Sequence, residues 1–488
     1  MISFTIALLA LLAGYLLYSK FIERIFGPDE RPTPAVAHSD GVDFVTLPSW
    51  KVFMIQFLNI AGTGPIFGAI MGAWYGPVAY LWIIFGCIFA GAVHDYLSGM
   101  LSVRHNGANL PFLVGRYLGG KTRAVMLVFS VFLLMMVGVV FVYSPALLLK
   151  DFAGSTTLWV IVIFAYYILA TMLPIDKIIG KFYPIFAFAL LFMAVALMVC
   201  LFVKMPELPE LWSNLDDCNR NTNTAWLGTT GYMAKNPLFP CLFLTIACGA
   251  ISGFHATQSP LMARCIKSEK MGRPIFYGAM ITEGVVALIW ATVSMYFFYY
   301  GGWRECVDVQ TAAPSVVEKV CTGWLGLFGG ILAVFGVVAA PITSGDTAFR
   351  SARLIIAEAL HLDQRSMAKR FYIAIPMFVV AVALLLWQME NPDGFNTVWQ
   401  WFGWSNQTLA VFTLWTITVY LVQKRKLFVV TLIPALFMTV VCATFLLVSP
   451  MAAGIDTSVG YWGSIAVLLI AIAWFFVWYK KQAKHNYY

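Results

Sequence analysis

The chain has 488 residues, of which 61% are hydrophobic and only 11% are charged, and its net charge is +8. Soluble domains contain about 45–50% apolar and about 25% charged residues, so this composition excludes a soluble enzyme and a secreted disulfide scaffold. The basic residues lie in short loops between apolar runs, which excludes a nucleic-acid-binding surface. The sequence therefore predicts an all-α polytopic membrane protein.

Apolar runs long enough to cross a hydrocarbon layer of ~30 Å recur along the whole chain. They do not alternate with a period of two, which excludes a β-barrel. The first run has no basic segment before it, so an uncleaved helix is expected rather than a signal peptide. Thirteen spans are predicted, at residues 2–22, 50–74, 77–103, 123–148, 157–174, 184–204, 238–262, 274–300, 323–345, 370–389, 395–422, 427–449 and 459–479.

The basic residues predict the orientation of these spans. When the N-terminus is placed outside and the loops alternate, 25 of the 31 Lys and Arg residues fall on the inner side and 6 on the outer side. Short inner loops of membrane proteins carry such an excess. We therefore expect the N-terminus outside and the C-terminus inside.

The cysteines show no spacing typical of a metal site. Six of the nine fall in or beside predicted spans, where a thiol behaves as a small apolar group. Cys218, Cys306 and Cys321 fall in outer loops. Cys306 and Cys321 share one loop, so a disulfide and two free thiols are both open.

Two spans are interrupted in similar ways by glycine and proline. The second contains Asn59 to Pro65, and the seventh contains Gly249 to His255. Such breaks at membrane depth persist only where they are buried in protein or line a watery cavity. The free N–H groups after Pro65 suit a carboxylate, and the freed carbonyls of residues 59–62 suit a cation. The alternative interpretation is a kink packed against a neighbouring helix.

Each interrupted span is the first of a group of five spans, and the two groups enter the membrane from opposite sides. This placement indicates a binding site between the inverted halves of a secondary transporter. The predicted divisions are an extra N-terminal helix and inner loop (1–49), a first five-helix repeat (50–204), an outer loop (205–237), a second five-helix repeat (238–423) and two additional C-terminal helices (424–488).

Ionisable residues within the spans are candidates for ion coupling, because a charge in hydrocarbon needs a partner or a purpose. His255 and Glu283 lie deepest and have no local partner in the sequence. Asp95 lies in the inner half of the third span, from which it could reach Arg104 or the membrane interface.

The ninth span carries two neighbouring hydroxyl groups. Thr343 and Ser344 could help to hold a hard cation such as Na⁺, although hydroxyls bonded to their own helix are the commoner arrangement. Asp346 is expected to end this span and to form an i,i+4 ion pair with Arg350 at the inner interface.

Asn406 and Gln407 place two amides within the eleventh span, where an amide normally bonds to another helix or to a substrate. The sequence contains no phosphate loop, nucleophile elbow, metalloprotease motif or flavin fingerprint. It therefore predicts neither an enzyme nor a resident cofactor.

The chain resembles the carbon starvation protein A family from about residue 28 to residue 410. Its Ala256–Pro260 run is similar to the short branch of that family. The other matching stretches are Arg31–Ala35, Asp40–Phe44, Ile60–Pro65, Ala90–Asp95, Ile251–His255, Tyr277–Met280 with Glu283, and Asn406–Gln407.

This resemblance implies a transporter of the bacterial inner (plasma) membrane, linked to nutrient limitation, with a five-plus-five inverted-repeat (LeuT-like) core. It also implies uptake of peptides or, in some members, of pyruvate by proton symport. Position 56 is glutamine where the long members carry histidine. A proton route is therefore expected to use His255 and Glu283 instead.

The leading hypothesis is a secondary active transporter that imports a peptide or a small carboxylate such as pyruvate. The coupling ion is H⁺, with Na⁺ as the alternative. The expected partners are the small-molecule substrate and the lipid bilayer, with no nucleic acid, and the oligomeric state is open. A channel or a nutrient sensor on the same fold is the alternative function, and an integral-membrane enzyme is the third.

Two sets of residues carry this hypothesis. The predicted substrate site comprises Asn59, Gly62, Thr63, Gly64, Gly249, Ser252, Gly253, His255, Asn406 and Gln407. The predicted ion-coupling residues are His255, Glu283, Asp95, Thr343 and Ser344, of which the last two would form the sodium site.

Overall fold

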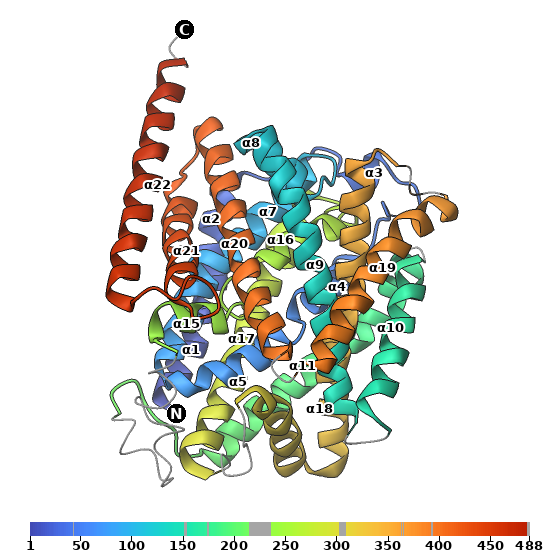
Figure 1. Cartoon of the computed structure of the whole chain (residues 1–488), viewed down its shortest axis with the longest axis vertical. Coiled ribbons are helices and arrows are strands. Elements are labelled where there is room, and N and C mark those ends of the chain that lie inside the picture. Colours follow the sequence, from blue (N-terminus) through green and yellow to red (C-terminus); the bar gives the residue numbers. More distant parts are fainter. Residues whose placement is uncertain are drawn as a thin grey trace.

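The computed structural model describes residues 1–41, 43–150, 154–172, 175–213, 236–301, 309–362, 364, 366–391 and 394–485. Within these ranges every regular element is a helix (Figure 1). Nine of the helices are long and apolar enough to cross a bilayer, and a tenth span results if the bent pair Ser49–Ala61 and Gly64–Tyr75 is counted as one. The multi-pass helical architecture is confirmed. The number of thirteen spans, their orientation and the inverted repeat stay predictions.

The elements of the first half include a helix broken near its middle and a short helix, α8, between two long ones. In chain order they are α1 (Ile2–Ala13), η1 (Gly14–Tyr18), α2 (Ser19–Phe26), α3 (Pro34–Ala37), α4 (Ser49–Ala61), η2 (Gly64–Gly68), α5 (Ala69–Gly72), η3 (Ala73–Tyr75), α6 (Val78–Phe85), η4 (Gly86–Gly91), α7 (Ala92–Arg104), α8 (Leu110–Leu118), α9 (Gly120–Leu149), α10 (Thr156–Met172) and α11 (Ile175–Lys204).

The described elements after residue 236 begin with a second interrupted helix. They are α15 (Leu238–Thr245), α16 (Gly253–Ala263), η5 (Glu269–Met271), η6 (Arg273–Tyr277), α17 (Gly278–Tyr296), η7 (Phe297–Gly301), α18 (Val309–Ala359), α19 (Met367–Glu390), α20 (Gly394–Gln423), α21 (Val429–Val448) and α22 (Thr457–His485).

Both predicted interruptions are present, and one predicted span end is wrong. The chain bends by 53° between α4 and η3, and seven residues separate α15 from α16. Helix α18 does not end near residue 345 but continues to Ala359, with one kink at Gly326. It continues because its polar residues after Thr343 are buried and bonded to neighbouring helices, so they need no membrane interface.

Some helices are buried in the centre of the protein, whereas others expose apolar side chains at its periphery. The membrane-spanning part of α18 is 82% buried and packs against α9 and α11. Helix α22 stands at one edge beside α21 (Figure 1), and only 17% of its span is buried. Its large apolar side chains, such as Trp462 and Trp474, are exposed. An apolar exposed surface of this kind suits hydrocarbon rather than water.

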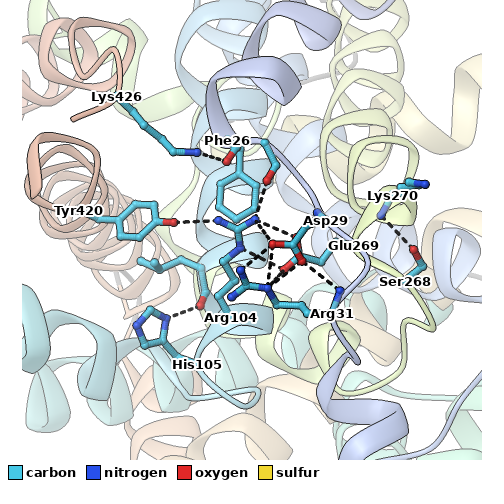
Figure 2. Close-up of polar contacts among 12 residues, drawn as sticks. Phe26, Asp29, Arg31, Arg104, His105, Ser268, Glu269, Lys270, Tyr420 and Lys426 are labelled. Atoms are coloured by element: carbon cyan, nitrogen blue, oxygen red, sulfur yellow. Dashed lines mark hydrogen bonds and ion pairs between the residues drawn. The ribbon is translucent and has the colours of Figure 1, made fainter. Parts of the chain in front are cut away.

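One end of the helix bundle is tied together by a buried carboxylate, Glu269 in η5 (Figure 2). Arg104, at the end of α7, donates to it from Nε at 3.0 Å and from Nη2 at 2.9 Å. The same guanidinium donates to the carbonyl of Gly27 at 2.6 Å and to the Tyr420 hydroxyl at 3.3 Å. The pair therefore connects α2, α7, η5 and α20. We call this end of the molecule the basic face, because the Arg- and Lys-rich loops lie here.

A second arginine extends this network. The backbone N–H of Asp29 donates to Glu269 at 2.9 Å, and the Asp29 carboxylate accepts from Arg31 (Figure 2). These hydrogen bonds from Arg31 hold the pKa of Asp29 well below its usual range. Asp29 therefore stays ionised at neutral and mildly acidic pH.

We expect Glu269→Gln to destabilise the protein strongly, because it leaves the Arg104 charge without its buried partner. Breaking a buried pair by removing one charge costs about 3–5 kcal/mol. Glu30→Gln, which removes an exposed pairing with Lys270 in the same region, should leave the melting temperature unchanged. Thermal unfolding of both variants in detergent measures this, and equal melting temperatures would contradict the role assigned to Glu269.

Candidate substrate site between two broken helices

The first break exposes backbone groups that a hydroxyl of another helix satisfies. Gly62 adopts φ +20° and ψ −148°, which ends α4. The Ser344 hydroxyl of α18 accepts from the Gly62 N–H at 3.2 Å and donates to the Leu58 carbonyl at 2.9 Å. Ser344 therefore lies at the break and is bonded to the backbone on both sides of it.

The second break is held by the two predicted amides of α20. Asn406 Oδ1 accepts from the Ser252 hydroxyl at 3.0 Å and from the Phe254 N–H at 2.7 Å. It thereby supplies the acceptor that the first turn of α16 otherwise lacks. Gln407 Nε2 donates to the Phe243 carbonyl in α15 at 2.8 Å. The amides therefore bond to both halves of the broken helix, on either side of the interruption.

Glycine is required where α16 meets α20. A Cβ atom on Gly253 would lie 2.3 Å from both the Ala410 nitrogen and the Asn406 oxygen of the backbone. Neither backbone atom can withdraw without disturbing α20. Gly253 therefore lets α16 begin directly against the helix that carries Asn406.

The two breaks touch each other. A Cβ on Gly64 would lie 2.3 Å from Cys248 Sγ, so the start of η2 contacts the segment between α15 and α16. Asn59 and Thr63 beside this contact are fully buried, and their side-chain polar atoms have no hydrogen-bond partner among the described residues. Buried polar groups are normally bonded, so these groups are candidates for contact with a polar ligand.

A chain of buried titratable groups lies beside the second break. Asp95 in α7 is hydrogen-bonded to two histidines, His94 Nδ1 at 2.7 Å and His255 Nδ1 at 2.8 Å. On its other side, His255 Nε2 lies 3.5 Å from Glu283 Oε2 in α17. All four side chains are fully buried. The predicted ion-coupling residues Asp95, His255 and Glu283 are thus brought together, and Asp95 does not reach Arg104.

This titratable chain borders the substrate site through Cys248. The sulfur lies within 4.8 Å of the facing His255 and Glu283 atoms and is 3.7 Å from the Ser252 hydroxyl. Ser252 in turn bonds to Asn406. A polar path therefore runs from the amide of α20 to the carboxyl group of α17.

The remaining predicted residues have local roles. Thr343 Oγ1 donates to the Ala340 carbonyl at 2.8 Å within its own helix. Gly249 packs against α17, where an added Cβ would meet the Ala287 Cβ at 2.3 Å. Asp346 does not end its span. It is buried and accepts a 2.5 Å hydrogen bond from the Tyr183 hydroxyl of α11, because α18 continues past it into the protein interior.

Two residues of the site received no role from the sequence. His94, an ionisable residue of the third span next to Asp95, is the second hydrogen-bond partner of that carboxylate. Tyr183 carries no signal of its own, because a tyrosine in an apolar helix is usually a core or interface residue. Cys321, expected in an outer loop, is a free and buried thiol within α18, and its predicted partner Cys306 lies outside the described residues, as does Cys218.

Comparison with known proteins confirms the resemblance seen in the motifs. The profile of the family described as carbon starvation protein CstA matches residues 1–144, 141–324 and 309–445. An uncharacterised membrane protein of Haemophilus influenzae is 46% identical over 66% of this chain and 97% of its own length.

Other relatives carry transporter names. The peptide transporter CstA of Campylobacter jejuni is 25% identical over 88% of this chain and 77% of its own length. The pyruvate/proton symporter BtsT of Escherichia coli is 28% identical over 57% of this chain and 46% of its own length. These relatives support a multi-pass protein of the inner membrane.

The fold is shared with a solved transporter. The Eremococcus coleocola manganese transporter aligns with a TM-score of 0.57 over 92% of this chain and 99% of its own. The sequence identity is 11%, so this likeness concerns the arrangement of the helices alone.

We expect Asn406→Ala to destabilise the protein, because it leaves the Ser252 hydroxyl and the Phe254 N–H unpaired in a buried site. Each orphaned group costs about 1–3 kcal/mol. Ser252→Ala removes only one donor and should cost less. The matched control is Asn391→Ala, since Asn391 is an exposed asparagine bonded to its own helix end. Melting temperatures that fall equally in all three variants would contradict the capping role.

Because the two breaks are in contact, a second substitution should restore the stability that Gly64→Ala removes. Gly64→Ala places a methyl group against Cys248, and overpacking of this kind costs about 1–3 kcal/mol. Cys248→Gly removes the obstructing atoms, so the double variant should recover most of the melting temperature lost in Gly64→Ala. Additive destabilisation would show that the two breaks do not touch.

Proposed function

Because the chain belongs to the carbon starvation protein CstA family, we propose that it is a secondary active transporter that imports peptides or a small carboxylate such as pyruvate. The proposal places the N-terminus outside and the C-terminus inside, with thirteen spans around a five-plus-five inverted-repeat core. It includes no enzymatic activity and no resident cofactor, and it links the protein to nutrient limitation through the family name.

One observation carries the choice of the proton as coupling ion. Both histidine Nδ1 atoms face the Asp95 carboxylate, so each is assigned a proton. His255 Nε2 is then an acceptor, and it faces a carboxylate oxygen of Glu283 at 3.5 Å. Two acceptors that face each other in a fully buried site need a proton or another cation between them. A proton shared by His255 and Glu283 satisfies both atoms.

The position of this proton couples it to the substrate site. Cys248 lies between the shared proton and Ser252, which bonds to the Asn406 amide. A substrate that binds across the two breaks would displace the segment containing Cys248 and Ser252. This displacement changes the surroundings of His255 and Glu283, and the gain or loss of the proton would follow it.

The substrate class follows from the groups at the first break. The N–H groups of Ile66 and Phe67 after Pro65 are bonded to the Thr63 carbonyl, so the positive end of the helix dipole is the feature of η2 that favours a carboxylate. Asn59 and Thr63 offer unpaired amide and hydroxyl groups beside it. Peptides and pyruvate-like acids share the carboxylate, and the names of two relatives, peptide transporter and pyruvate/proton symporter, support both classes.

Sodium is the alternative coupling ion, with Thr343 and Ser344 as its hydroxyl ligands. In the structure Ser344 is already bonded across the first break, and Thr343 donates to its own helix. A sodium ion would have to take the place of the Ser344–Leu58 hydrogen bond. This arrangement favours the proton.

The proposal is tested by uptake into liposomes that contain the purified protein, with a chelator in all buffers. We expect dialanine or pyruvate to accumulate when the outside is made more acidic than the inside, with sodium replaceable by potassium. Uptake should rise as external pH falls. A requirement for sodium, with little pH dependence and with loss of uptake in Thr343→Ala, would assign the coupling to the hydroxyl site instead.

A channel or a sensor would behave differently in the same experiment. A channel would equilibrate the substrate without accumulating it and without saturation, and a sensor would bind it without moving it. Either result would contradict the transporter proposal.

We further expect Glu283→Gln to uncouple transport. The amide cannot exchange a proton with His255, so the substrate should equilibrate across the membrane without accumulating, while its binding persists. Accumulation in a pH gradient and binding by equilibrium dialysis measure the two properties separately. Glu30→Gln is the matched control on the basic face and should accumulate substrate normally. Full accumulation by Glu283→Gln would show that a proton shared by His255 and Glu283 does not drive transport.

A further inference from the structure

A second polar cavity lies at the basic face, away from the breaks. Its volume is about 830 Å³, within the range of about 300–1,000 Å³ typical of ligand sites. Its walls are formed by Asp40, Asp43 and Phe44, the connection from α7 to α8, and the C-terminal ends of α16 and α18. The break at Gly253 lies one length of α16 away, roughly 16 Å for 11 residues.

One wall of the cavity contains a buried carboxylate, Asp43, with an oxygen that accepts no hydrogen bond from the described part of the chain. Asp43 is only 6% exposed, and its Oδ1 has no hydrogen-bond partner among the described residues. A buried ionised carboxylate is costly unless it is paired. The cavity therefore has a place for a cationic group.

Another wall contributes a buried guanidinium with free donors. Arg264, at the end of α16, is 8% exposed. Its Nε donates to the Gly107 carbonyl at 2.9 Å, and its plane lies over the Phe44 ring at 5.1 Å. Within the described part of the chain its terminal nitrogens have no hydrogen-bond acceptor. These contacts fix the position of the side chain and leave its two terminal nitrogens available to bind a carboxylate.

Among the described lining residues, three are basic (Arg104, Arg116 and Arg264) and three are acidic (Asp40, Asp43 and Glu358). Arg104 is paired with Glu269, which does not line the cavity. Burial lowers the pKa of His105, which also lines the cavity, so this imidazole adds no charge at neutral pH. A small monoanion such as pyruvate would add a negative charge and leave Asp43 unpaired. A zwitterion satisfies both Asp43 and Arg264.

We propose that this cavity is a second binding site, for zwitterionic peptides, in which Asp43 receives the α-ammonium group and Arg264 receives the α-carboxylate. Helices α7 and α16 each carry a residue of the candidate substrate site near their start and reach this cavity at their C-terminal end. Helix α18 carries Ser344 at the first break and lines the cavity through Leu354, Ala357 and Glu358. The cavity is thus placed to receive a peptide that leaves the breaks toward the basic face. The proposal rests on the transporter function above and narrows its substrate class to peptides.

The test uses a cysteine placed in the cavity as a reporter of occupancy. Ala108→Cys lies on the cavity wall and is partly exposed, so a maleimide should label it in the detergent-purified protein. The parent protein gives the background from the native cysteines. We expect dialanine to slow the labelling of Ala108→Cys, and N-acetyl-dialanine, dialanine amide and pyruvate to have no effect at the same concentration.

Substitutions then test whether Asp43 and Arg264 bind the two charged ends of the peptide. Asp43→Asn and Arg264→Gln, each combined with Ala108→Cys, should raise the dialanine concentration that gives half-protection by about tenfold or more, as expected for loss of a charged partner. Asp43→Asn keeps the shape of the side chain, so it remains informative if Arg264→Gln fails to fold. Glu30→Gln is the matched control on the same face and should change nothing.

Several results would overturn the proposal. They are an absence of protection by dialanine, equal protection by pyruvate or by the blocked peptides, and unchanged protection in Asp43→Asn. Protection that disappears in Asn406→Ala would place the peptide at the breaks rather than in the cavity. Failure of the transporter proposal is distinguishable, because protection would then persist in a protein that takes up no substrate into liposomes.

Discussion

The candidate site is organised around the contact between His255 and Glu283, whose facing atoms Nε2 and Oε2 lie 3.5 Å apart in a fully buried position. Asp95 is hydrogen-bonded to two histidines through their Nδ1 atoms, which leaves the far nitrogen of His255 facing the Glu283 carboxyl group. A proton or another cation between the two atoms would satisfy both. Helices α7, α16 and α17 therefore enclose the position at which the proposed transporter would exchange its proton.

Helix α7 links this constraint to the basic face. Asp95 and Arg104 lie nine residues apart on it, roughly 13 Å along the axis. Arg104 is held by buried Glu269, and that ion pair connects α7 to α2 and α20. Helix α7 therefore carries a residue of the buried titratable chain near its start and the partner of Glu269 at its end.

The sequence was sufficient for features that are local and chemical. Glycine and proline marked both breaks, hydropathy marked the helices, and the cost of buried charge singled out His255 and Glu283. Contacts between distant segments were not accessible. Asp95 meets His255 across 160 positions and Arg104 meets Glu269 across 165, and periodicity in one chain carries no information about such pairs.

Asp346 was misassigned because its partner, Tyr183, comes from another helix. The Asp40–Phe44 stretch was noted only as a family motif, since its cavity exists only when four segments meet.

The most direct measurement of the central claim is proton movement during uptake with no imposed pH gradient. A pH-sensitive dye inside liposomes that contain the protein would report the internal pH when dialanine or pyruvate is added outside. A proton shared by His255 and Glu283 predicts internal acidification that tracks substrate entry and is absent in Glu283→Gln. Substrate entry at unchanged internal pH, in the unsubstituted protein, would contradict the account.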